Sequence, residues 1–181
     1  MEKKWLMKNG GREEEIIELK ESLKVDRIIA TLLHQRGLRS FEEARSFLNH
    51  DLTDLHNPYL MKNMDLAVVR LIQAIDSKEK ILLFGDYDVD GTTVVALMHE
   101  VLKNHHKELG FYIPDRYSEG YGISTAGIDF AKSNGYSLII ALDCGIKAIE
   151  KVDYAKSLGI DFIICDHHEP GEIVPNCIVL D

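Results

Sequence analysis

The chain has 181 residues, of which 45% are hydrophobic and 28% charged, a balance typical of a globular protein with a core of its own. Its net charge of −9 does not favour nucleic-acid binding, so a role on nucleic acid would require metal ions or a further part of the protein to reverse the local field. Three widely spaced cysteines argue against a disulfide framework, the first residues lack the apolar core of a signal peptide, and no apolar run approaches the ~20 residues of a membrane span, so we expect a cytoplasmic protein with reduced thiols.

The first part of the chain has the apolar spacing of helices. Helices are predicted over residues 13–23, 26–36 and 40–48, the last opened by a capping box of Ser40 and Glu43. A further helix is predicted to begin at Asp65 as its N-cap, with its apolar residues on one face. We therefore expect a helical amino-terminal region over residues 1–78.

Strands and helices alternate from residue 79 onward. Short apolar runs predict strands at 80–84, 109–113, 137–142, 161–165 and 177–180, with helices at 92–106, 124–134 and 146–157 between them. Such alternation predicts an α/β domain over residues 79–181, a mostly parallel sheet with helices on both faces. Because the chain stops at a strand without a closing helix, we expect it to be the amino-terminal part of a larger protein.

Acidic and histidine residues follow three of the predicted strands. Strand 80–84 runs into Asp86, Asp88 and Asp90, strand 137–142 runs into Asp143, and strand 161–165 runs into Asp166-His-His168. Ligands of open parallel sheets bind beyond the carboxyl ends of the strands, so these three loops are expected to meet at one rim. The three aspartates of the first loop occupy alternate positions, so in an extended segment their carboxylates would point to the same side. Their mutual repulsion there would be costly without a bound cation.

Two other kinds of binding site have similar sequence motifs, but this chain lacks residues that each of them requires. A D-x-D-x-D-G sequence also opens a calcium-binding EF-hand loop, but the twelfth position from Asp86 is Leu97 instead of a bidentate Glu, and a strand precedes the loop. No Gly-Lys-Ser/Thr follows the glycines, which excludes a P-loop. Mixed carboxylate and imidazole ligands favour Mn²⁺, with Mg²⁺ as the alternative, and several carboxylates suggest two ions. The residues therefore predict a two-metal phosphoester hydrolase, but they do not identify its substrate.

These loops resemble the motifs of the DHH phosphoesterase superfamily, and within it those of the RecJ exonuclease family. The segments that carry the resemblance are Gly85–Thr93, Leu142–Ile146, Asp166–Glu169, Ile113–Arg116 and Glu119–Gly122, together with the helical lead-in. The resemblance implies 5′-to-3′ degradation of single-stranded DNA in recombination and repair, with a single-strand-binding protein and a recombination helicase as partners and no membrane. It covers nearly the whole chain.

The resemblance also implies roles for individual residues. The positions that match metal ligands are Asp86, Asp88, Asp90, Asp143 and His167. His168 would touch the scissile phosphate, and Asp166 would support the histidines. Arg116 would bind the DNA backbone and Tyr121 would stack on a base. The part of the family that follows, with a further aspartate ligand and a second domain, has no counterpart here, so this chain alone is expected to be inactive.

Two other functions remain open from the sequence. One is a DHH phosphatase or phosphodiesterase acting on pyrophosphate or short oligonucleotides, although roughly eighty residues before the first motif favour the exonuclease. The other is a non-catalytic metal-binding module, which the intact acids and histidines disfavour.

Overall fold

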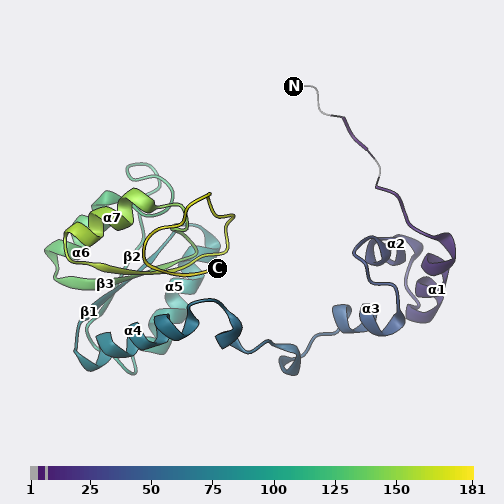
Figure 1. Ribbon diagram of the computed structural model, residues 1–181, viewed down its shortest axis with the longest axis horizontal. Coiled ribbons are helices and arrows are strands. Elements are labelled where there is room, and N and C mark those ends of the chain that lie inside the picture. Colours follow the sequence, from purple (N-terminus) through teal and green to yellow (C-terminus); the bar gives the residue numbers. More distant parts are fainter. Residues whose placement is uncertain (1–3, 7) are drawn as a thin grey trace. The chain divides into compact units, whose positions relative to one another are not determined.

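The computed structural model describes residues 4–6 and 8–181, and the chain divides into two compact units, Met1–His56 and Asn57–Asp181 (Figure 1). The sequence pattern predicts the division at residue 78, after helix α4 (Met64–Asp76), whereas in the structure this helix lies in the second unit. No helix among the described residues has the length and apolar character needed to cross a membrane.

The first unit is a small helical cluster. Its elements are α1 (Glu13–Leu23), α2 (Arg27–Gln35), α3 (Phe41–Leu48) and the 3₁₀ turn η1 (Leu52–Asp54). The predicted capping box is confirmed: Ser40 accepts a hydrogen bond from the Glu43 N–H at 3.2 Å, and Glu43 accepts one from the Ser40 N–H at 3.1 Å. The buried apolar side chains of the three helices form a core that belongs to this unit alone, made of Ile16, Leu19, Ala30, Leu33 and Ala44.

The second unit is built on one parallel sheet, which confirms the predicted fold class. Its strands are β1 (Lys80–Gly85), β2 (Leu109–Tyr112), β3 (Tyr136–Leu142), β4 (Asp161–Cys165) and β5 (Ile178–Leu180), in the order β2-β1-β3-β4-β5. All four strand pairs are parallel. Both faces of the central strands are covered, which explains their nearly unbroken apolar sequences.

Helices cover the two faces of the sheet in pairs. Figure 1 shows α4 and α5 (Val89–Leu102) on one face, with α6 (Thr125–Ser133) and α7 (Ile149–Ser157) on the other. Each face of the sheet has its own hydrophobic core, and alternate residues along a strand belong to one core or the other. Ile81 and Ile140 pack with α4 and α5, whereas Leu82 and Ile139 pack with α6 and α7. This alternation is the period of two expected of strands.

Three predicted helix starts differ from the structure. Helix α5 begins at Val89, so Asp90 lies in its first turn, and α7 begins at Ile149 after a longer loop. Asp65 is not the N-cap of α4: the cap position is Asn63, which has a left-handed backbone (φ 65°) and makes no side-chain capping bond. The Asn63 side chain instead donates to the Val179 carbonyl at 3.0 Å, a contact across 116 residues that local sequence cannot show.

Candidate metal centre and active site

The acidic loops meet at the point where the strand order reverses. Strand β1 lies between β2 and β3, so the chain leaves β1 in one direction and returns to its other side. Ligands of such sheets bind in the crevice at this switch point, beyond the carboxyl ends of the strands. The loops after β1, β3 and β4 all lie there, as the positions of the motifs predict.

The acidic loop after β1 is not extended, which corrects the expected alternation of its carboxylates. Asp86 is fully buried, and its carboxylate accepts hydrogen bonds from the Tyr87 N–H at 2.6 Å and the Gly122 N–H at 3.2 Å. Asp88 is the N-cap of α5 and accepts from the Gly91 N–H at 2.9 Å. Asp90 is exposed in the first turn of the helix. The three side chains therefore have different surroundings.

Gly85 and Gly91 permit close packing at this point. A Cβ on Gly91 would lie 2.6 Å from the backbone nitrogen and oxygen of Asp86, and a Cβ on Gly85 would lie 2.4 Å from Val95. Neither glycine has a positive φ, so a left-handed backbone is not the reason for glycine at these positions. They allow the start of α5 to approach the end of β1 without a side chain between them.

Asp143 and the two histidines form the group best placed to hold a metal ion. Among the described residues, Asp143, His167 and His168 offer ligand atoms that all lie within 4.8 Å of one another. His167 Nε2 lies 3.1 Å from Asp143 Oδ1. Asp143 has a left-handed backbone (φ 62°), an uncommon conformation for a residue other than glycine that often marks functional sites. Imidazole with carboxylate is a donor set that fits Mn²⁺.

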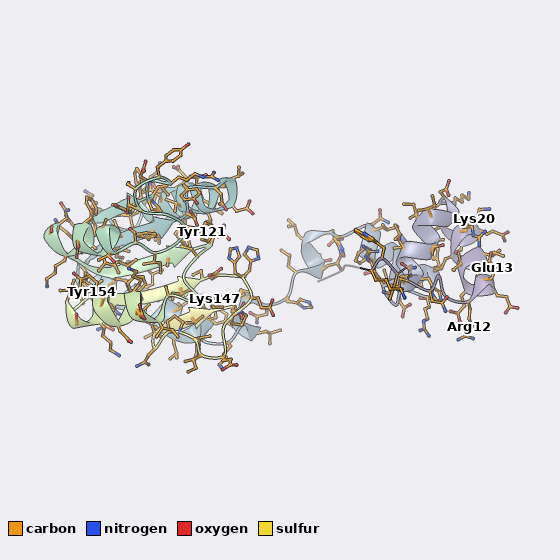
Figure 2. All side chains as sticks on the ribbon, turned by 90° about the horizontal axis from the view of Figure 1, so that it is seen from above. Arg12, Glu13, Lys20, Tyr121, Lys147 and Tyr154 are labelled. Atoms are coloured by element: carbon orange, nitrogen blue, oxygen red, sulfur yellow. The ribbon has the colours of Figure 1, made fainter. Side chains whose placement is uncertain are left out.

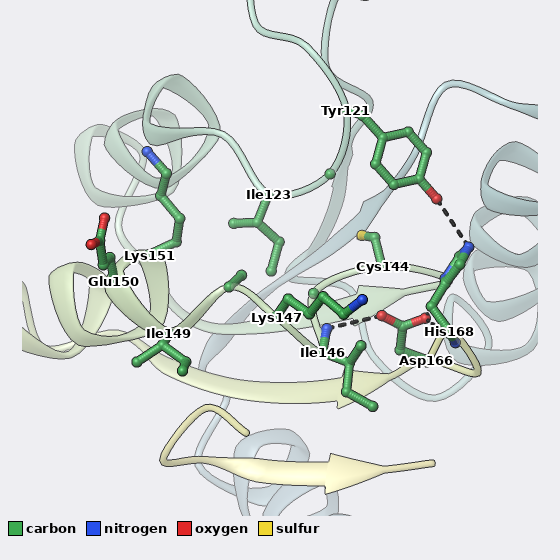
Figure 3. A pocket seen from close by; sticks show the side chains of 13 residues that line it. Tyr121, Ile123, Cys144, Ile146, Lys147, Ile149, Glu150, Lys151, Asp166 and His168 are labelled. Atoms are coloured by element: carbon green, nitrogen blue, oxygen red, sulfur yellow. Dashed lines mark hydrogen bonds and ion pairs between the residues drawn. The ribbon is translucent and has the colours of Figure 1, made fainter. Parts of the chain in front are cut away.

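Asp166 organises the loop that carries the histidines. Its side chain is only 2% exposed. One carboxylate oxygen accepts from the N–H groups of His167 (2.8 Å) and His168 (3.1 Å) and from His168 Nδ1 (2.7 Å). The other oxygen accepts from the Ile146 N–H at 2.9 Å, which ties the loop after β4 to the loop after β3 (Figure 3). With Nδ1 donating to Asp166, His168 Nε2 is left to face the site.

Burial, hydrogen bonds and neighbouring charges lower the pKa of Asp166 and raise those of His168 and Asp143. Burial alone would raise the pKa of Asp166, but hydrogen bonds from the Ile146 N–H and from His168 outweigh it and lower the pKa. The bond to Asp166 raises the pKa of His168. Burial and the neighbouring Asp88 raise the pKa of Asp143, which is the effect expected when carboxylates share a site without a cation.

An aromatic wall borders the histidines. The Tyr121 hydroxyl lies 3.3 Å from His168 Nε2, and its ring meets Tyr87 edge to face at 6.0 Å. Burial, together with Asp86 and Asp88, raises the pKa of Tyr121 to about 12, so the hydroxyl stays protonated. The Arg116 guanidinium lies over the Tyr87 ring, 5.2 Å from its centre. A series of contacts thus leads from Arg116 through Tyr87 and Tyr121 to His168.

Glu119 is a residue whose role the sequence does not reveal. Its carboxylate accepts from the Asp115 N–H (2.9 Å), the Tyr112 hydroxyl (2.9 Å) and the Ser124 hydroxyl. It therefore closes the loop between β2 and α6, whose Gly122 N–H binds Asp86. A single glutamate in a polar loop carries no local signal of this kind, because its partners depend on how the loop folds back.

Two cavities flank the histidines. The first, about 680 Å³, lies between Tyr121 and the loop that leads into α7, with Asp166 and His168 at one end (Figure 3). The second, about 700 Å³ and mostly apolar, lies between α4 and α5 and reaches Asp90, Asp143 and His167. Figure 2 labels Tyr121 and Lys147 at the end of the second unit where the strands finish.

The comparisons with known proteins agree with this geometry. The model of the DHH family, N-terminal domain, matches residues 80–180. The chain is 42% identical over 164 residues to the single-stranded-DNA-specific exonuclease RecJ of Bacillus subtilis (strain 168), covering 91% of this chain and 21% of that protein. It is 35% identical over 159 residues to RecJ of Dickeya dadantii (strain 3937), covering 87% of this chain and 27% of that one.

A solved structure of exonuclease RecJ bound to manganese is also similar. It is 29% identical in sequence with a TM-score of 0.62, over 66% of this chain and 31% of that one. The chain thus spans about a quarter of the length of the curated relatives named above.

Proposed function

We propose that this chain, which belongs to the DHH family, is part of a metal-dependent exonuclease. The whole protein would degrade single-stranded DNA from the 5′ end in recombination and repair. The observation that carries the proposal is the Asp143, His167 and His168 group at the switch point of the sheet. The identity with RecJ proteins over most of this chain supports the substrate. A cytoplasmic location fits the three free thiols, and a single-strand-binding protein and a recombination helicase are the proposed partners.

The proposed cofactor is Mn²⁺, bound as two ions. The proposed ligands are Asp86, Asp88, Asp90, Asp143 and His167. Asp143 and His167 are already close, and the exposed Asp88 and Asp90 lie near enough to affect the titration of Asp143. When bound, such ions neutralise charge on the phosphate and lower the pKa of the attacking water.

The chain's own residues orient the substrate and one imidazole. Asp166 holds His168 Nδ1, so Nε2 points toward the site, where it would contact a non-bridging oxygen of the scissile phosphate. Tyr121, 55% exposed, offers a ring face against which a base would stack. Arg116 would pair with the DNA backbone from its position over Tyr87.

A polarity assay tests the function. The intact protein with Mn²⁺ should shorten single strands from the 5′ end and leave duplex DNA intact, as judged on oligonucleotides labelled at either end. Asp90→Ala should abolish the activity without unfolding the protein, because Asp90 is exposed, whereas Asp88→Ala also removes the cap of α5, worth about 1 kcal/mol. Release of phosphate from pyrophosphate, with single strands left intact, would instead assign the small-substrate phosphatase.

A further inference from the structure

The cavity beside His168 has one wall that the proposed roles leave unused. Tyr121, Gly122 and Ile123 line one side, and the residues from Cys144 to Lys151 line the other. At about 680 Å³ the cavity lies within the usual range of small-molecule sites. Asp166 and His168 close one end, so the cavity is continuous with the position proposed for the scissile phosphate.

Lys147 supplies a cation to this cavity. It is exposed and directly follows Ile146, whose N–H binds Asp166, so the backbone beneath the lysine is held by the site itself. In Figure 3 its side chain extends toward the end of the cavity that carries Asp166 and His168. The dashed lines of the figure join Tyr121 to His168 and Ile146 to Asp166, and none reaches the Lys147 ammonium.

The other cations nearby are less well placed. The Lys151 ammonium donates to the Thr125 hydroxyl, and Arg116 does not line this cavity. Lys147 therefore has the ammonium best placed to meet an anion inside the cavity. The surrounding charges explain why a cation would help to bind the substrate. The rim carries five aspartates, which repel a phosphate chain, and metal ions bound among them would offset this repulsion only around the scissile group.

We propose that Lys147 is a substrate-binding residue that pairs with the phosphate next to the scissile one, so that the cavity holds one nucleotide of the strand between Lys147 and Tyr121. This inference rests on the proposed function and extends it to a named contact. A lysine that merely balances the charge of Asp166 would affect metal binding or stability. A lysine that contacts phosphate affects substrate affinity and its dependence on salt.

The test compares three variants of the intact protein with Mn²⁺ on a 5′-phosphorylated single strand. Lys147→Gln removes the charge, Lys147→Arg keeps it, and Lys156→Gln removes the same charge from the last turn of α7, away from the cavity. The measurement is kcat and KM over a series of NaCl concentrations.

Lys147→Gln should raise KM about threefold at low salt and leave kcat within about twofold. It should also make the plot of log(kcat/KM) against log[NaCl] shallower by about 0.7, the value of one phosphate contact on a single strand. Lys147→Arg and Lys156→Gln should retain the wild-type slope. An active wild type with the same slope and KM in Lys147→Gln overturns this inference alone, as does a loss confined to kcat. A wild-type protein that leaves single strands intact overturns the proposed function and the inference with it.

Discussion

At the scale of single residues, the site depends on one buried carboxylate. Asp166 makes four hydrogen bonds while only 2% of its side chain is exposed, and it links the loop after β4 to the loop after β3. Its charge is stabilised by N–H donors, so it serves as an orienting group for His168. Outer partners of this kind typically contribute 10- to 100-fold to metal affinity or activity.

Asp166→Asn should therefore lower the rate of single-strand hydrolysis about 10- to 100-fold in the intact protein. The amide nitrogen cannot accept from the Ile146 N–H, so the free energy of unfolding should also fall by roughly 1–3 kcal/mol. Single-turnover rates and urea titrations measure the two effects. Glu172→Gln, which removes one negative charge from an exposed position nearby in the chain, should change neither. Equal rates for Asp166→Asn and wild type would remove Asp166 from its proposed role.

At the scale of elements, the approach of α5 to the end of β1 shapes the acidic loop. Gly91 lies inside the helix, where glycine normally costs about 0.5–1 kcal/mol relative to alanine. The structure keeps it because a Cβ there would meet the Asp86 backbone at 2.6 Å. Local propensity and tertiary packing thus predict opposite signs for the same substitution.

Gly91→Ala should destabilise the protein by roughly 1–3 kcal/mol in a urea titration, because the clash is with backbone atoms that cannot rotate away. It should also weaken Mn²⁺-dependent activity, since the shift would move Asp86 and Asp88. Thr93→Ala, at an exposed position two residues further along α5, serves as the control and should be close to neutral. A stabilised Gly91→Ala protein would show that helix propensity outweighs the contact.

A second contact between elements lies at the other end of the sheet, where strands β1 and β4 begin. Arg70 of α4 forms a two-bonded pair with Glu79, at 3.2 and 2.8 Å, and also contacts Asp161 at the start of β4. The bond from Arg70, aided by Ser137, outweighs burial and lowers the pKa of Glu79 below its ordinary 4.5. The unfolded chain therefore binds a proton at Glu79 before the folded chain does, and stability from this pair is present above pH 4.5 and is lost as the pH falls through the lowered pKa.

Glu79→Gln should accordingly reduce the free energy of unfolding at neutral pH, and its difference from wild type should shrink below pH 4.5. Urea titrations at several pH values between about 7 and 3 measure the difference. Glu172→Gln again supplies the exposed comparison. A difference that stays constant over this range would mean that the charge of Glu79 contributes nothing to stability.

At the scale of the whole molecule, the chain contains two units with separate cores. The first has its own helical core, and the second has a core on each face of its sheet. Helix α4 contributes Ala67 and Ala74 to one of these faces, so the second unit needs residues from 57 onward. The helical region of residues 1–78 that the sequence pattern suggests would separate α4 from the sheet it covers.

Two truncations test this division. A chain that starts at residue 57 should keep the thermal transition of the second unit within about 5 °C, whereas one that starts at residue 79 should lose roughly 3 kcal/mol or more, because it uncovers apolar strand residues and breaks the Arg70–Glu79 pair. Circular dichroism melts of both chains provide the comparison. Equal melting of the two would place the boundary at residue 78.

Local sequence was sufficient to predict most elements and the rim where the chemistry lies. Apolar periodicity depends on neighbours a few residues apart, so it predicts the strands and the capped helix α3. Parallel strands connected by helices must end at one rim, so the order of the motifs brings Asp86, Asp143 and Asp166 to the same side of the sheet.

Only the tertiary structure decided how those side chains are used. Asp86 turns inward because the Gly122 N–H, 36 residues away, reaches it, and Asp88 becomes a helix cap because α5 starts earlier than its apolar pattern predicts. Asp166 meets Ile146 across 20 residues, and the same loop brings Lys147 to the cavity of Tyr121. These contacts join segments far apart in the chain, and their energies depend on burial and on distances that no local pattern encodes.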